Sequence, residues 1–449
     1  MDTVDALIHA RWIIPVEPEG RVLEQHALVV HHGRIAALLP SDEAKRRYRA
    51  DETLDLPRHA LIPGLVNAHT HAAMSLLRGV ADDLPLKPWL EDHVWPLEHR
   101  WVSPEFVREG TELAMAEMLR GGITCFNDMY FFPEASAQAI HEAGMRASLG
   151  MVVFDFPSPW GSGPEDYLHK GLTLRDRHKN DPLLSFMFAP HATYTVSPPW
   201  LKKVRALADE LDLPVHTHLH ETAEEVAESV KVHGKRPIAS LLELGLFTPS
   251  LLAAHMTQLT EGEIAETARC GVSVVHCPSS NLKLASGFCP VAELIKAGVN
   301  VALGTDGAAS NNTLDMFAEM RIAALLAKGV AGDAAAVPAA KALSMVTLNG
   351  ARALGLERDT GSLTPGKWAD LAAVDLGMAD TQPVHHPLSA LVYAAGRHQV
   401  SDVWVAGKRL LKDGTPTTVD IAAILQKAEA WRGRIAAEAP GTARAQGAR

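Results

Sequence analysis

The sequence contains little cysteine and no long apolar segment. Four of its 449 residues are cysteines, and no two of them are spaced as C-x-x-C: Cys125, Cys270, Cys277 and Cys289. So few thiols do not form a disulfide framework, which favours a reduced, cytoplasmic compartment. Because no run of 18 apolar residues occurs and the N-terminus lacks a basic segment followed by an apolar one, we expect neither a membrane span nor a signal peptide.

Basic residues are also fewer than acidic ones. The chain has 42 Lys and Arg against 53 Asp and Glu, a net charge of −11. Nucleic-acid binders usually carry a basic surface, so we expect no nucleic-acid partner. No glycine-rich dinucleotide or nucleotide fingerprint follows a predicted strand, and no G-x-S-x-G elbow is present. We expect a small-molecule ligand, no membrane partner and a homo-oligomer, with which the net charge is compatible.

Histidine, in contrast, is abundant, with 22 residues. If the protein holds a metal, imidazole and carboxylate groups rather than thiolates are the expected ligands. Hydrophobic residues make up 47% and charged residues 21% of the chain, which is typical of a folded globular protein.

The central part of the chain alternates short apolar runs with helical segments, which predicts a (β/α)8 TIM barrel over residues 59–358. Helix-start signals lie between the runs, among them Ser103-Pro104 and the capping box Thr260-x-x-Glu263. The eight runs are Ala60–Asn67, Gly122–Asp128, Arg146–Asp155, Leu183–His191, Leu213–His218, Leu251–His255, Val272–His276 and Val299–Asp306.

The two ends of the chain share a strand-rich pattern. Hairpins are predicted over residues 27–39, turning at His31-His32-Gly33-Arg34, and over residues 400–411. We therefore expect residues 1–58 and 359–420 to complete one small β-sandwich domain. Residues 421–449 are expected to form a C-terminal helix and tail.

Polar residues recur where the predicted barrel strands end. Seven of the eight runs finish on His or Asp or have one close to the end, and in this fold the carboxyl ends of the strands line the active site. His69 and His71 are two residues apart, so both side chains can point to the same side of a strand. Turn and cap residues are the alternative interpretation, which suits Asp better than five histidines.

These motifs resemble the amidohydrolase superfamily. The segment Pro63-Gly64-Leu65-Val66-Asn67-Ala68-His69-Thr70-His71 is similar to its signature, and His218-x-x-Glu221, Ala254-His255, Thr305-Asp306 and Pro365-Gly366-Lys367 follow in the family's order. Within the superfamily, the chain resembles the branch of 5′-methylthioadenosine/S-adenosylhomocysteine deaminases. The motifs that carry this resemblance are Trp95-Pro96-Leu97-Glu98, Pro190-His191-x-x-Tyr194 and His276-Cys277-Pro278-x-Ser280-Asn281.

The resemblance implies a mononuclear metal site and a hydrolytic deamination. Its ligands would be His69, His71, His218 and Asp306, a donor set that suits Zn²⁺ and also accommodates Fe²⁺. No lysine ends the fourth run, which argues against a second, lysine-bridged metal. The family gives Glu221 the role of proton shuttle, His255 a contact with the water or the developing oxygen, and Asp306 a second role as proton acceptor.

The resemblance also implies substrate contacts. Glu98 would bind a ribose diol and His191 the substrate, and Trp89 and Trp95 could stack on a purine or pack an alkylthio group, although loop-core packing is the ordinary use of tryptophan. A homocysteine carboxylate would need an arginine, for which Arg175 and Arg177 are the candidates considered. His216, His220 and His276 receive no defined catalytic role.

The predicted reaction is deamination of 5′-methylthioadenosine, and perhaps of S-adenosylhomocysteine and adenosine, to the 6-oxo product and ammonia. The alternative keeps the site but changes the ring to guanine, pterin, cytosine or an s-triazine. A hypothesis of another class is a catalytically inactive barrel used for assembly, which predicts lost metal ligands.

Overall fold

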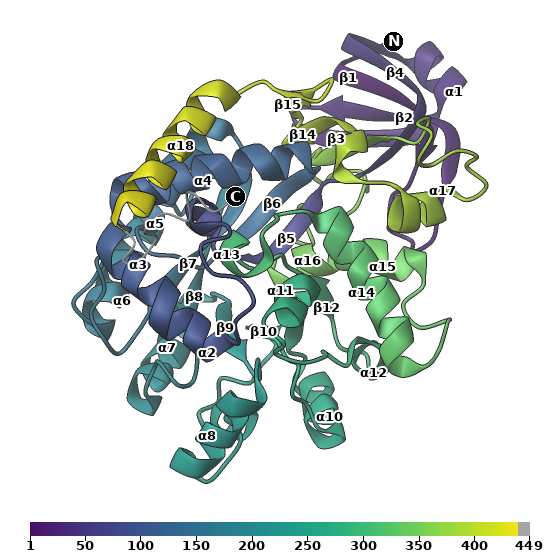
Figure 1. The fold of residues 1–449 in the computed structure, drawn as a ribbon. Helices are drawn as coiled ribbons and strands as arrows, with labels where there is room; N and C mark the ends of the chain where they lie inside the picture. The colour runs from purple at the N-terminus through teal and green to yellow at the C-terminus, as the bar shows by residue number, and fades with distance from the viewer. Residues whose placement is uncertain (439–449) are drawn as a thin grey trace, which may run out of the picture.

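The computed structural model describes residues 1–438 and confirms the predicted barrel (Figure 1). Eight parallel strands follow one another around it in chain order, from β5 to β12. Their bounds are β5 (Leu65–Thr70), β6 (Ile123–Asp128), β7 (Arg146–Val153), β8 (Leu184–Pro190), β9 (Val215–Leu219), β10 (Leu251–His255), β11 (Ser273–His276) and β12 (Val301–Leu303). Each corresponds to one of the predicted runs, because a strand buried on both faces appears in the sequence as a continuous apolar segment.

The last strand meets the first through backbone and side-chain contacts at the active-site end. The amide of Asp306 donates to the carbonyl of His69 at 3.0 Å, and the Asn67 side chain pairs with Thr305. This close approach requires Gly304, since a Cβ there would lie 2.8 Å from backbone atoms of His69. The closure therefore places Asp306 beside the His69-x-His71 motif.

Helices surround the barrel strands, and the predicted start signals are confirmed. The Ser103 side chain caps α4, and Thr260 and Glu263 form a capping box at α10. The helices that follow successive strands are α4 (Pro104–Arg120), α5 (Pro133–Ala143), α6 (Pro164–His178), α7 (Pro198–Leu211), α8 (Ala223–His233), α9 (Pro237–Glu243), α10 (Glu261–Cys270), α11 (Pro278–Lys283), α12 (Val291–Lys296), α13 (Ala308–Asn311), α14 (Met316–Ala331), α15 (Ala339–Met345) and α16 (Leu348–Ala353).

A long segment between β5 and α4 supplies part of the cavity wall described below. It is folded into short helical turns, η1 (Ala72–Leu77), α2 (Leu86–Pro88), η2 (Trp89–Val94) and α3 (Trp95–Trp101). Further short turns precede the C-terminal strands, α17 (Pro387–Ser389), η3 (Ala390–Ala394) and η4 (Arg397–Gln399).

Both ends of the chain contribute to the second sheet, as predicted. Its strand order is β16-β15-β14-β13-β4-β1-β2-β3, and residues from both ends share one apolar core. The strands are β1 (Asp2–Ile13), β2 (Leu23–His31), β3 (Arg34–Pro40), β4 (Tyr48–Pro63), β13 (Leu371–Asp375), β14 (Val400–Val405), β15 (Lys408–Lys412) and β16 (Thr415–Pro416), with α1 (Ser41–Arg47) before β4. Both predicted hairpins are present.

The chain passes from this sheet into the barrel at Gly64. Pro63 still pairs with Leu371 in the terminal sheet, whereas the Leu65 amide donates to Gly122 beside β6. A Cβ at position 64 would lie 2.1 Å from Thr124, so the crossing requires glycine. The start of the first predicted run, residues 60–63, therefore belongs to β4 rather than to the barrel.

A buried ion pair joins barrel and terminal sheet. The Arg146 guanidinium at the start of β7 donates to both carboxylate oxygens of Asp370, at 2.8 and 3.3 Å. Asp370 also accepts from Thr360 and from the Ala406 amide. Since this carboxylate contacts several separate segments, it fixes how the C-terminal strands lie against the barrel.

The predicted C-terminal helix is α18 (Ile421–Glu438), which packs along α4 (Figure 1). Its Trp431 contacts the ring of Phe106 and donates to Glu109. The predicted tail, residues 440–449, lies outside the described residues. All four cysteines are free thiols, and no helix within residues 1–438 has the length and apolarity needed to cross a bilayer.

Candidate active site

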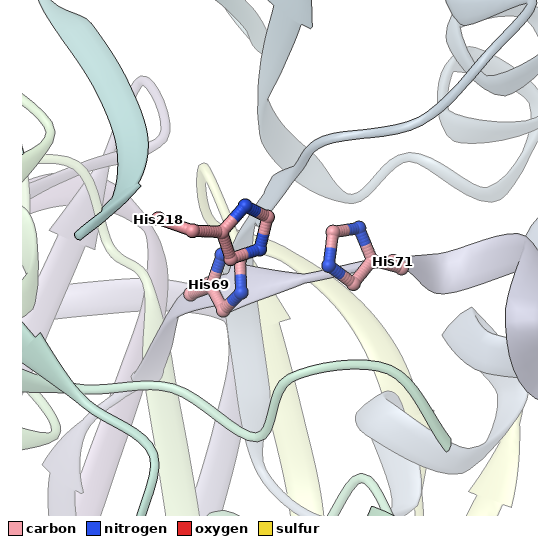
Figure 2. Close-up of side chains that lie close together, drawn as sticks. All are labelled: His69, His71 and His218. Atoms are coloured by element: carbon pink, nitrogen blue, oxygen red, sulfur yellow. The ribbon is translucent and has the colours of Figure 1, made fainter. Parts of the chain in front are cut away.

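Three histidines converge at the carboxyl end of the barrel. His69 and His71 come from the end of β5 and His218 from β9, and the three imidazoles face one another (Figure 2). One ligand atom of each lies within 4.8 Å of the others, and the same holds for the group formed by His69, His255 and Asp306. The two groups share His69, so the site has one centre.

Backbone carbonyls orient two of these rings. The Nδ1 of His71 lies 2.6 Å from the carbonyl oxygen of Met129, and the Nδ1 of His218 lies 2.8 Å from that of His191. A carbonyl can only accept, so each Nδ1 carries a proton and each Nε2 is left for another partner. Burial holds the pKa of His218 well below its ordinary value, so this ring is neutral. Burial also opposes a charge on His71, but its Nε2 faces the Asp306 carboxylate, which raises the pKa of His71 to about 9.

The remaining contacts around His69 fit a divalent cation. Its Nδ1 lies 3.0 Å from Nε2 of His216, while its own Nε2 is buried without a hydrogen-bond partner. The Oδ1 of Asp306 is 3.3 Å from this nitrogen and 3.3 Å from Nε2 of His71. A buried carboxylate beside unpaired ring nitrogens is a costly arrangement unless a positive charge lies between them.

Asp306 is held firmly in this position. Its Oδ2 accepts from Ser280 at 2.7 Å and Ser310 at 2.9 Å, and its Oδ1 accepts from the Gly307 amide at 2.8 Å. Burial opposes ionisation, but the hydrogen bonds and charges of His69 and His71 bring the pKa of Asp306 well below its ordinary value. The backbone is left-handed at Asp306, with φ 62°, a strain often found at functional residues.

Glu221 lies next to this cluster. Its Oε2 is 3.7 Å from Nε2 of His255, and the side chain is buried. Its backbone amide and that of His220 donate to the two carboxylate oxygens of Glu225, at 2.6 and 3.1 Å. Burial raises the pKa of Glu221, so this carboxylate is suited to pick up and return a proton.

His255 is positioned by Asn281. The Nδ1 of His255 lies 2.8 Å from Oδ1 of Asn281, which can only accept, so Nε2 of His255 is left toward Glu221. The backbone at His255 is also left-handed, with φ 74°. The ends of β10 and β12 therefore both present strained residues to the same centre.

A cavity opens directly onto the cluster. Its wall includes His71, His218, Glu221, His255 and Asp306 at one end, together with aromatic and aliphatic side chains. The structure places all the predicted substrate contacts in this wall, namely Trp89, Trp95, Glu98 and His191.

Glu98 is a buried carboxylate in the cavity wall. The Tyr130 hydroxyl donates to its Oε1 at 2.7 Å, and no Lys or Arg among the described residues lines this cavity. Burial raises the pKa of Glu98 to about 7. An acceptor with unused lone pairs in such a place is suited to bind ligand hydroxyl groups.

His191 is a neutral ring in the same wall. Its Nδ1 lies 3.0 Å from the Thr195 hydroxyl, which itself lies 3.2 Å from the Ala192 carbonyl. Burial lowers the pKa of His191 to about 3. The ring also packs against Phe154, with centroids 4.9 Å apart, so it can meet a ligand as an uncharged hydrogen-bonding group.

The histidines without a predicted role have structural contacts. His220 accepts from the Ile238 amide through Nε2, at 3.2 Å, and its Nδ1 lies 3.0 Å from the Gln258 carbonyl. His216 lies between His69 and Asn127. His276 is buried at the end of β11, and its Nδ1 has no hydrogen-bond partner.

The two candidate arginines lie elsewhere. Arg175 and Arg177 are in the last turn of α6, and Arg175 pairs with Asp176. In an α/β barrel the helices run back from the active-site end, so the C-terminus of α6 is at the opposite end of the barrel. Neither arginine can reach a ligand in the cavity.

Sequence reasoning missed several cavity residues. Tyr130, Phe131 and Phe154 line the wall, and Asn281 positions His255. Asn281 and Ser280 stand in the His276-Cys277-Pro278 motif, so a signal for them was present. Nothing in the local sequence distinguishes the aromatic residues from ordinary core.

Comparisons with known proteins agree with this geometry. The model of the amidohydrolase family matches residues 60–410. A 5-methylthioadenosine/S-adenosylhomocysteine deaminase of Teredinibacter turnerae is 52% identical over 436 residues, covering 97% of this chain and 99% of the relative. A protein of the same description from Thermodesulfovibrio yellowstonii is 43% identical over 432 residues, covering 96% of this chain and 98% of that relative.

Solved structures give the same picture. An adenosine deaminase from Xanthomonas campestris with bound zinc superposes with a TM-score of 0.96 at 55% identity, covering 97% of this chain and 99% of that one. A guanine deaminase of E. coli has a TM-score of 0.80 at 24% identity, covering 92% of this chain and 100% of that one, which shows a shared fold.

Proposed function

Because the chain belongs to the amidohydrolase family, we propose that it is a mononuclear zinc aminohydrolase acting on 5′-methylthioadenosine. Adenosine and S-adenosylhomocysteine are the related substrates to compare. The reaction adds water across the C6 position of the adenine ring and releases ammonia, giving the 6-oxo product. The observation that carries the proposal is one cavity that joins the histidine–aspartate cluster to the buried carboxylate of Glu98.

The metal would be held by His69, His71, His218 and Asp306. These nitrogen and oxygen donors suit Zn²⁺, and Fe²⁺ could occupy the same set. When bound, zinc supplies Lewis acidity that lowers the pKa of a coordinated water molecule toward about 7. The chain contributes the neutral form of each imidazole and the charge of Asp306.

Proton movement falls to Glu221 and its neighbours. As water adds to C6, Glu221 accepts a proton and delivers it to the ring nitrogen N1, and Asp306 can take the second proton. His255, 3.7 Å from Glu221, can donate a hydrogen bond from Nε2 to the oxygen that develops at C6 when its ring carries a proton on both nitrogens. The amino group receives this second proton and leaves as ammonia, and the 6-oxo ring remains.

Glu98 would distinguish nucleosides from free bases. Its carboxylate can accept hydrogen bonds from the two ribose hydroxyls while Tyr130 keeps it in place. A guanine, pterin, cytosine or s-triazine ring has no diol to offer. Trp89 and Trp95 supply flat apolar surface for the purine or the 5′ group, and neutral His191 supplies a polar contact.

A UV-monitored substrate panel tests the proposal. We expect turnover of 5′-methylthioadenosine and adenosine, and little or none of adenine, guanine and cytosine. Glu98→Ala should reduce kcat/KM for the nucleosides by at least about 100-fold, since it removes two charge-assisted hydrogen bonds. Unchanged nucleoside turnover in Glu98→Ala would exclude the ribose contact.

Metal analysis addresses the alternative of an inactive assembly protein. All four proposed ligands and Glu221 are present at one centre, so we expect about one zinc per chain after purification or zinc addition. A chain that binds far less than one metal would favour the assembly role instead. A homo-oligomeric state stays a prediction.

A further inference from the structure

We propose that the outer part of the cavity is a charge filter, which admits 5′-thioethers whose tail has no carboxylate and rejects a tail that carries one. This inference rests on the proposed function, because that function fixes how a nucleoside lies. The reacting C6 must reach Glu221 and His255, and the ribose must reach Glu98. The 5′ substituent is then directed away from the metal cluster.

The position of Trp95 indicates where this substituent goes. Trp95 lies three residues before Glu98 on α3, so the two side chains share one face of that helix. Trp95 also borders a second, outer groove over α8, together with Leu86, Leu90 and Tyr194. These four side chains separate the catalytic cavity from the outer groove.

The walls beyond Glu98 offer no cation. No Lys or Arg among the described residues lines the cavity, and its charged or ionisable members all belong to the cluster, Glu98 or His191. Two basic residues are sequence neighbours of wall side chains, Lys283 beside Leu284 and Lys87 beside Leu86. Lys283 donates to Asp82 at 2.5 Å, and Lys87 lines the outer groove. The other wall residues are apolar or aromatic, among them Leu86, Leu90, Trp95, Phe156 and Tyr194.

The outer groove does not supply the missing cation. Its two lysines are exposed, and each lies near one of the groove's own acids, with Lys87 3.9 Å from Glu91 and Lys231 3.2 Å from Glu228. Two further acids, Glu224 and Glu225, also line it. A carboxylate that emerges from the cavity would therefore meet an acidic surface.

A homocysteine tail is thus poorly matched to this chain. Its carboxylate would lose hydration in the apolar passage and gain no guanidinium or ammonium partner there. A methylthio group, in contrast, gains apolar contacts there. We infer that 5′-methylthioadenosine is preferred over S-adenosylhomocysteine by charge and not by length.

A matched substrate series tests the filter with the zinc-loaded protein. We compare 5′-methylthioadenosine, 5′-propylthioadenosine, 5′-(3-aminopropylthio)adenosine and S-adenosylhomocysteine. In this order, the second compound has a longer tail, the third adds an amine to it, and the fourth carries both an amine and a carboxylate. We expect the neutral propyl compound to stay within about 10-fold of 5′-methylthioadenosine in kcat/KM. S-adenosylhomocysteine should fall at least about 10-fold below both the propyl and the aminopropyl compounds, as expected for an unpaired charged group.

The outcomes distinguish a failure of the charge filter from a failure of the proposed function. If S-adenosylhomocysteine matches or exceeds the propyl compound, the filter is wrong while the proposed function stands. If the propyl compound falls as low as S-adenosylhomocysteine, length and not charge decides, and the filter is again wrong. If none of the thioethers is deaminated while zinc is bound, the proposed function fails and the filter with it.

A gain-of-function pair localises the filter. Phe156 is 41% exposed at the cavity wall and packs near Trp95, so Phe156→Arg places a cation at the passage. Phe156→Gln is the matched control, because it also removes the ring but adds no charge. We expect the ratio of kcat/KM for S-adenosylhomocysteine to that for the propyl compound to be at least about 5-fold higher in Phe156→Arg than in Phe156→Gln. Equal ratios in the two variants would overturn the assignment of this rim as the filter.

Discussion

Replacement of Glu221 by glutamine tests the central chemical assignment. The side chain is buried, and its Oε2 lies 3.7 Å from His255. Glutamine has nearly the same shape but cannot carry a proton between water and the ring. The backbone amide of residue 221 would still donate to Glu225, so the local fold should persist.

The expected loss follows from the role of the carboxylate. General acid–base catalysis is typically worth about 10²–10⁴ in rate, which corresponds to about 3–5 kcal/mol of transition-state stabilisation. We therefore expect kcat for 5′-methylthioadenosine to fall by that factor, with a smaller change in KM. Zinc content should stay near one per chain, since Glu221 is not among the proposed ligands.

The assay combines absorbance-monitored deamination with metal analysis of the same sample. Glu261→Gln is the control, because Glu261 is an exposed acid in the first turn of α10, away from the cavity. It should leave kcat unchanged. If Glu221→Gln retains its metal and its kcat stays within about 10-fold of wild type, Glu221 is not the proton shuttle.

Three further changes have defined outcomes. Removal of the metal with a chelator should abolish deamination and lower Tm, and added zinc should restore both. Tm should respond because a ligand that binds the folded state stabilises it. A chelator-treated protein that keeps its activity would contradict the metal assignment. Burial raises the pKa of Glu98 from 4.5 to about 7. The folded state is therefore unaffected by this acid below pH 4.5 and is destabilised as the pH rises from 4.5 toward 7, because the unfolded chain ionises first. Glu98→Gln should consequently raise the free energy of unfolding at pH 8 by about 1–3 kcal/mol and change it little at pH 4.5, as measured by urea titration; equal effects at the two pH values would refute the ionisation argument. Asp370→Asn leaves Arg146 buried without its carboxylate, so urea unfolding should show a loss of about 3–5 kcal/mol, whereas a loss below about 1 kcal/mol would mean that water replaces the pair.

Much of the fold can be read from the sequence because its strands are buried on both faces. Each barrel strand lies within a short apolar run, most of these runs have His or Asp at or near the end, and both terminal hairpins turn at glycine-containing segments. The place where the chain leaves the terminal sheet could not be read in the same way. Residues 60–67 form one apolar run, and the break at Gly64 depends on contact with Thr124, which is distant in the sequence.

The metal cluster was predictable to a greater extent than the cavity. Strand periodicity puts His69 and His71 on one side of a strand, and the resemblance to the amidohydrolase superfamily added His218 and Asp306 to them. The rest of the wall comes from segments whose side chains meet through the barrel alone. Tyr130, for example, lies just after β6, and its hydrogen-bond partner Glu98 lies in the long segment between β5 and α4. No local pattern in the sequence indicates that these two residues meet.

This division has a physical origin that bears on specificity. The groups that act on the reacting atoms need fixed protonation states, so the backbone holds them at strand ends, as the carbonyls of Met129 and His191 hold His71 and His218. The groups that meet the variable end of a substrate need only shape and charge, and loop segments can supply both without disturbing the barrel. Relatives can thus share the cluster and differ in the tails they accept. In this chain the difference would be the absence of a positive charge from the cavity walls beyond Glu98.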